Sequence, residues 1–70
     1  MTTPDLDAIR AAIATYERHA AGYHHLALMA GCRQDPIART WSRLAVEHAR
    51  DADWLRKDLE RLERWEEMRP

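Results

Sequence analysis

Two stripes of apolar or aromatic residues constrain what this 70-residue chain can fold into. Within each stripe the residues recur at alternating spacings of three and four, the heptad pattern of a helix that packs lengthwise against another helix. No segment alternates with the period of two that marks a β-strand. The sequence therefore predicts an all-α fold. The first stripe consists of Leu6, Ile9, Ile13, Tyr16, Ala20, Tyr23, Ala27 and Ala30, and the second of Ala38, Trp41, Ala45, His48, Ala52, Leu55, Leu59 and Leu62.

Proline and glycine mark where the two helices should begin and end. Thr3 followed by Pro4 is a helix cap with proline at the first helical position, where its missing N–H costs nothing, and Asp35-Pro36 repeats this signal. Gly31 can adopt the left-handed conformation that ends a helix. These residues predict a first helix that starts near Pro4 and a second that starts near Pro36.

A single domain with two helices follows from these signals. We expect helices over about 4–30 and about 36–68, joined by a loop over about 31–35 that holds the single cysteine, Cys32. Such a short connection forces the helices to be antiparallel neighbours. The predicted architecture is a helical hairpin.

Large apolar residues outside the stripes predict self-association. Two helices can pack along one face but cannot enclose a core, so each remaining apolar face needs another surface. Two hairpins related by a two-fold axis would form a four-helix bundle dimer, and a higher oligomer would serve the same purpose. The predicted oligomer interface consists of Leu26, Leu28, Met29, Trp41, Trp54 and Trp65.

Composition and motifs narrow the functional classes. The formal net charge of −1 gives no bulk attraction to nucleic acid or to an anionic membrane. The chain has no run of 18 apolar residues, and its first residues lack the basic and apolar parts of a signal peptide. No glycine-rich phosphate loop, nucleophilic serine motif, Cys-x-x-Cys or His-Glu-x-x-His pair occurs. We therefore expect a cytoplasmic protein without membrane contact, catalytic residues, metal or cofactor.

A polar layer is expected midway along the hairpin. His48 interrupts the apolar stripe of the second helix, and equal distances from the loop place it opposite His19 and Tyr23. With Tyr16, these residues could form a hydrogen-bonded belt that fixes the register of the helices. Alternatively, Tyr16, His19, Tyr23 and His48 could line a ligand site.

The ligand-site alternative also draws on arginines near the loop. Arg39 and Arg43 lie in the stretch of the second helix that is least neutralised by carboxylates. Imidazole and phenol rings beside guanidinium groups suit an anionic, nucleotide-like small molecule bound at a subunit interface.

A line of basic residues on the second helix suggests a further alternative. Arg43, Arg50, Lys57 and Arg64 recur every seven residues and could contact phosphates of RNA or DNA. Asp53 and Glu60 precede basic residues by four positions, which predicts local ion pairs that neutralise much of this charge. The preferred interpretation is a non-catalytic interaction or regulatory protein that acts as a homo-oligomer and binds a macromolecular partner, most simply a protein.

Overall fold

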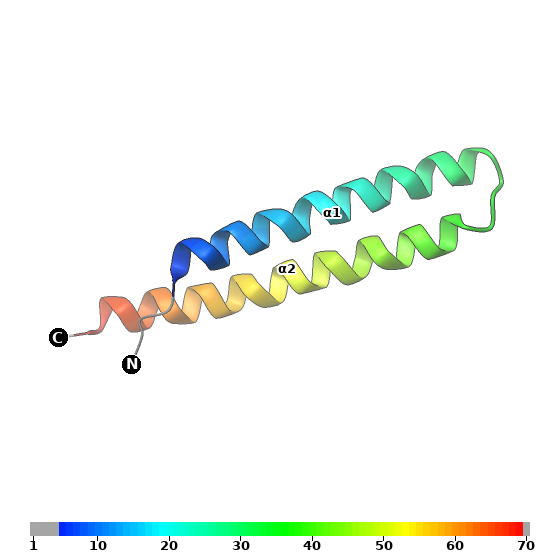
Figure 1. Ribbon diagram of the computed structural model, residues 1–70. Coiled ribbons are helices and arrows are strands. Elements are labelled where there is room, and N and C mark those ends of the chain that lie inside the picture. Colours follow the sequence, from blue (N-terminus) through cyan, green and yellow to red (C-terminus); the bar gives the residue numbers. More distant parts are fainter. Residues whose placement is uncertain (1–4, 70) are drawn as a thin grey trace.

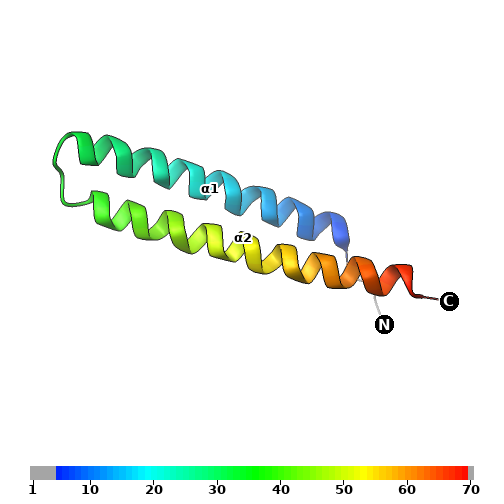
Figure 2. The same ribbon diagram turned by 180° about the vertical axis from the view of Figure 1, so that it is seen from behind.

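The computed structural model describes residues 5–69, which form two antiparallel helices side by side (Figure 1). Helix α1 spans Leu6–Cys32 and helix α2 spans Ala38–Glu67. The view from behind shows the same arrangement, with the loop at one end of a rod and the start of α1 beside the end of α2 at the other (Figure 2). The rod measures 58 × 16 × 14 Å. The predicted all-α helical hairpin is confirmed.

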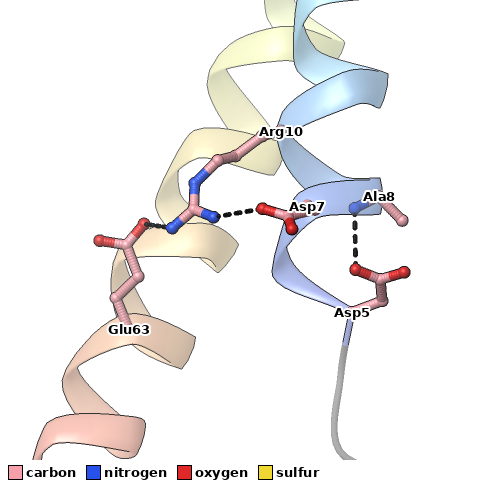
Figure 3. Close-up of polar contacts among 5 residues, drawn as sticks. All are labelled: Asp5, Asp7, Ala8, Arg10 and Glu63. Carbon is pink, nitrogen blue, oxygen red and sulfur yellow. Dashed lines mark hydrogen bonds and ion pairs between the residues drawn. The ribbon is translucent and has the colours of Figure 1, made fainter.

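Helix α1 is capped by an aspartate. The Asp5 backbone is extended, and its carboxylate accepts a hydrogen bond of 3.1 Å from the Ala8 N–H (Figure 3). This bond satisfies one of the N–H groups that have no partner inside the helix. The predicted cap at Thr3-Pro4 lies outside the described residues.

The end of α1 differs from the prediction. Gly31 stays helical, and α1 continues through Cys32, so the cysteine is the last residue of the helix and not part of the loop. Gln34 adopts the left-handed conformation instead, with φ of 56°. Its N–H donates to the Gly31 carbonyl at 3.0 Å, and the Asp35 N–H donates to the Ala30 carbonyl at 2.9 Å. These two bonds form a Schellman motif and satisfy carbonyls that the helix end would otherwise leave unpaired.

Helix α2 begins two residues later than predicted. The Asp35 carboxylate accepts from the Ile37 N–H at 3.0 Å, and the Ala38 N–H donates to the Asp35 carbonyl at 3.1 Å. Residues 36–37 therefore form a turn that leads into the helix, and the regular α-helix starts at Ala38. Asp35 caps this turn and not the first turn of α2.

The contact between the helices follows the two predicted stripes. Every residue of both stripes is buried or half-buried. The buried positions among residues 5–69 are Ile13, Ala27, Ala30, Ala45 and Ala52. Most of them are alanines, because a small side chain can be covered completely by the facing helix.

Much apolar surface remains outside this contact. Trp54 is 68% exposed and Trp65 is 50% exposed, and Leu26, Leu28 and Met29 are exposed as well. Trp41, the sixth residue predicted at an oligomer interface, is half-buried. Neither α1 nor α2 contains a stretch apolar and long enough to cross a bilayer.

Candidate functional site

Four aromatic rings meet midway along the hairpin, as the sequence predicts. The ring of His48 on α2 lies against three rings of α1, with centroid distances of 5.8 Å to Tyr16, 5.6 Å to His19 and 5.1 Å to Tyr23. All three ring pairs are tilted, with interplanar angles between 44° and 57°. We call these four residues the ring layer.

The heptad spacing of α1 explains why these rings converge. Tyr16, His19 and Tyr23 are separated by three and four residues, so they lie on neighbouring ridges of one helical face. His48 occupies a stripe position of α2 and projects between them. The ring layer is thus fixed by the same register that aligns the apolar stripes.

The ring layer does not form the predicted hydrogen-bonded belt. Within residues 5–69 no hydrogen bond joins any two of its four side chains, and the buried Nδ1 atom of His48 has no partner. Tilted packing of the rings brings their faces and edges together and leaves their polar atoms apart. A buried polar atom without a partner typically costs about 1–3 kcal/mol.

Trp41 extends the ring layer toward the loop. Its ring stacks on Tyr23 with a centroid distance of 5.7 Å and an interplanar angle of 15°. Tyr23 therefore contacts an aromatic ring on each side, Trp41 on one and His48 on the other. Aromatic pairs of this kind contribute about 0.5–1.5 kcal/mol beyond the area they bury.

An open groove adjoins the ring layer on the surface of α1. Arg18 and His25 contribute cationic or titratable groups to its wall, and Leu26 contributes apolar surface. Apart from the adjoining residues and backbone of α1, no heavy atom of the described residues lies within 4 Å of the position that a Cβ at Gly22 would occupy, so the groove is open above this glycine. Pockets that bind small molecules usually bury most of the ligand surface, which a single helix cannot do without a second wall. The groove is lined by Arg18, His19, Gly22, Tyr23, His25 and Leu26.

The two arginines of the predicted ligand site lie away from the ring layer. At about 100° per residue, Arg43 is displaced by about 140° around α2 from His48, and Arg39 by about 180°. The Arg43 guanidinium lies 4.0 Å from the Glu47 carboxylate, with 72% of the arginine side chain exposed. Arg18, which the sequence argument did not select, is the arginine beside the rings. The sequence does contain a signal for it: Arg18 lies seven residues before His25, a spacing that places both residues on the same face of α1.

Ion pairs on α2 also differ from those predicted. Pairs between Asp53 and Lys57 and between Glu60 and Arg64 are absent among the described residues; Asp53 instead pairs with Arg56 at 3.4 Å. Arg61 pairs with Asp58 in the same i,i+3 pattern. Aspartate has a short side chain, and the long arginine side chain one turn later reaches it readily.

Some basic side chains of α2 have no carboxylate within 4 Å in the described part of the chain. They are Arg39, Arg50, Lys57 and Arg64. Of residues 5–69, no three histidine, cysteine, aspartate or glutamate side chains converge as metal ligands would.

Comparison of the chain with protein-family models, with curated proteins and with solved structures finds no match.

Proposed function

We propose that this chain is a small, non-catalytic interaction or regulatory protein of the cytoplasm. It acts as a homo-oligomeric helical bundle and binds a macromolecular partner, most simply a protein, through its helix faces. The observation that carries this proposal is the number of large apolar side chains exposed on a rod only two helices thick. Large exposed apolar surfaces are typical of protein–protein interfaces.

The small core of the hairpin supports the proposal. Of the described residues, Ile13 is the one large side chain that is buried, whereas Trp54, Leu28 and Trp65 are at least half exposed. Full burial of a large apolar side chain contributes about 1.5–3 kcal/mol. Chains of this size usually need a disulfide, a metal or a partner to become stable. Covering the exposed residues would supply that missing stability.

The geometry of the ring layer also favours a non-catalytic role. A nucleophile or general base needs a hydrogen-bonded neighbour to orient and activate it. His48 and His19 have no such neighbour among the described residues, and the adjoining groove is open to solvent.

Light scattering over a range of protein concentrations tests self-association. We expect at least twice the chain mass of 8.2 kDa at micromolar concentration. A fully helical species that keeps the mass of one chain at every concentration would contradict the homo-oligomer.

A ligand-binding bundle is a second candidate function, favoured by the groove that places Arg18 beside His19 and Tyr23. A second subunit would provide the wall that this groove lacks. A thermal-shift screen against nucleotides tests it, because a ligand that binds only the folded state raises the melting temperature. Stabilisation by one nucleotide that is lost in Arg18→Gln would support this candidate, and no shift with any nucleotide would contradict it.

Contact with RNA or DNA is a third candidate, favoured by the row of unpaired side chains at Arg50, Lys57 and Arg64. Binding through phosphates weakens steeply as salt concentration rises. A gel shift at two salt concentrations tests this candidate. Binding that survives replacement of all three residues by glutamine would contradict it.

A further inference from the structure

The two flanks of α1, on either side of its buried stripe, differ in charge. One flank carries both ion pairs that join the helices within residues 5–69. Arg10 lies 3.4 Å from Glu63 (Figure 3), and Glu17 pairs with Arg56. The other flank, which we call the open flank, has no charged residue over its whole length. The open flank consists of Ala8, Ala12, Thr15, His19, Gly22 and Leu26.

On α2, a row of residues carries the two exposed tryptophans. Trp54, Asp58, Arg61 and Trp65 follow one another at spacings of four, three and four, so they lie along one line of the helix. We call this row the Trp ridge. Its two charged members pair with each other, and the Arg69 guanidinium lies 5.2 Å from the centre of the Trp65 ring. Among the described residues, Trp54 is the tryptophan of the ridge without such a contact.

The open flank and the Trp ridge lie on the same side of the hairpin. Asp58 and Arg61 line a groove between the helices together with Ile9. The ion pairs surround a different groove, which contains Arg10 and Glu17. Because each helix has one flank on either side of the shared contact, the flank of α1 without ion pairs must adjoin the Trp ridge. Together they form one broad face, which we call the open face.

We propose that the open face binds a second copy of this chain in an antiparallel arrangement. The two-fold axis crosses the rod at the level of His19 and His48, so the loops of the two copies lie at opposite ends. This inference rests on the proposed self-association and adds to it a face, an orientation and a register.

The size of the open face fits a stable dimer. A face of 58 × 16 Å has a projected area of about 900 Å², and a standard protein interface buries about 800 Å² on each partner. The open face is therefore large enough without any additional segment.

Charge complementarity sets the orientation. Around the loop, residues 24–47 contain three arginines, Arg33, Arg39 and Arg43, against two carboxylates, Asp35 and Glu47. At the opposite end, residues 5–10 and 58–69 contain seven carboxylates against four arginines. An antiparallel dimer places each basic end beside an acidic end, whereas a dimer with both loops at one end brings like charges together.

The open flank also fits a copy of itself when the axis passes through His19. His19 is the central residue of α1, so Leu26 of one copy lies level with Ala12 of the second copy, seven residues on either side of the axis. A leucine thus faces an alanine, and the space above Gly22 can receive a side chain of the second copy. This alternation of large and small residues allows close approach of the two α1 helices.

The exposed thiol of Cys32 gives a direct test of orientation in the full chain. A nitroxide on Cys32 lies thirteen residues from the axis, so double electron–electron resonance should report about 40 Å between labels at 1.5 Å rise per residue. A distance below about 20 Å would overturn the antiparallel arrangement and leave self-association standing, because both loops would then share one end. A monomer mass in light scattering would contradict self-association itself.

Two matched leucines test the face. Leu26 lies on the open flank and is 42% exposed, and Leu28 lies on the flank with the ion pairs and is 57% exposed. We expect Leu26→Arg to shift the protein toward monomers by at least tenfold in dissociation constant, and Leu28→Arg to leave the mass unchanged. Circular dichroism checks that both variants remain helical. Equal weakening by both variants, or weakening by Leu28→Arg alone, would overturn the assignment of the open face.

Discussion

The half of the rod next to the loop and the half next to the chain ends are held together differently. Near the loop, Ala27, Ala30 and Ala45 are buried between the helices, with Trp41 stacked on Tyr23 beside them. Near the chain ends, the stripes contain leucine and isoleucine, and residues such as Leu55, Leu59 and Leu62 stay half-buried. Two helices cover an alanine fully, but a leucine extends past the line of contact and keeps part of its surface in solvent.

Ion pairs follow the same division. Both pairs that join α1 to α2 lie in the half next to the chain ends, Arg10 with Glu63 and Arg56 with Glu17. Among the described residues of the loop half, no ion pair joins the helices, and the rings provide the contacts. An incomplete apolar contact is thus accompanied by charged groups that bridge its edge, while a complete contact has none.

The largest effect should come from Ile13→Ala, which removes the one large side chain that is buried within residues 5–69. We expect a loss of about 2–5 kcal/mol in the free energy of unfolding, because both apolar burial and packing are lost. Urea denaturation at fixed protein concentration measures it. Leu59→Ala is the matched change at a half-buried position and should cost less. Equal losses would mean that a second copy covers Leu59 in solution.

Ala30→Leu tests whether the loop half is packed as tightly as its alanines indicate. Ala30 is 1% exposed, so a larger side chain would push the helices apart, and we expect a loss of about 1–3 kcal/mol. Ala21→Leu, at an exposed position of the same helix, is the control and should melt close to the parent protein. A variant at Ala30 as stable as this control would contradict tight packing near the loop.

At the boundary between the halves, His48→Leu should stabilise the hairpin. The substitution removes the buried Nδ1 atom that has no partner and keeps a side chain of similar size, so we expect a gain of about 1 kcal/mol. Thermal unfolding at neutral pH gives the sign, and light scattering shows whether the oligomeric state is kept. A clear loss of stability would show that the imidazole makes a favourable polar contact in the assembled protein.

The smallest effect should come from Arg56→Gln, in the half next to the chain ends. This change removes the ion pair with Glu17, but about half of each side chain is exposed, so the expected loss is below about 1 kcal/mol. Unfolding should be measured at low and at high salt. The difference in the free energy of unfolding between the parent protein and Arg56→Gln should shrink as the salt concentration rises. A loss well above that range would place Arg56 inside an interface between copies.

The features of the fold that depend on helical periodicity can be predicted from the sequence. Those that depend on contacts between the two helices or at the helix ends cannot. Heptad spacing alone identifies both stripes, and equal distances from the loop place His48 opposite His19 and Tyr23. The residue at which the loop begins is harder to predict from the sequence. Gln34 takes the left-handed conformation because its N–H and the N–H of Asp35 donate hydrogen bonds to carbonyls at the end of α1. Glycine preference at helix ends pointed to Gly31 instead.

The polar contacts of the ring layer and of α2 were predicted least well. Arg56 could have paired with several carboxylates on its own helix, and the additional partner Glu17 is 39 residues away in the sequence. Likewise, residue spacing brings four rings together but does not fix their tilt, which decides whether their nitrogen and oxygen atoms can meet. The helical period thus predicts which residues share a face of each helix, whereas tertiary contacts decide which polar side chains become partners.

Contacts between the helices join residues that are farther apart in the sequence with increasing distance from the loop. This arrangement predicts the order in which the contacts form during folding and break during unfolding. Tyr23 and Trp41, next to the loop, are 18 residues apart in the sequence, whereas Arg10 and Glu63 at the far end are 53 apart. The entropy lost on closing a loop grows with the logarithm of its length, so the far contacts cost about 1 kcal/mol more to form than the near ones. Closure should therefore begin at the turn and proceed toward the chain ends. Opening should run in reverse, so amide protons near the chain ends exchange with solvent before those beside the loop.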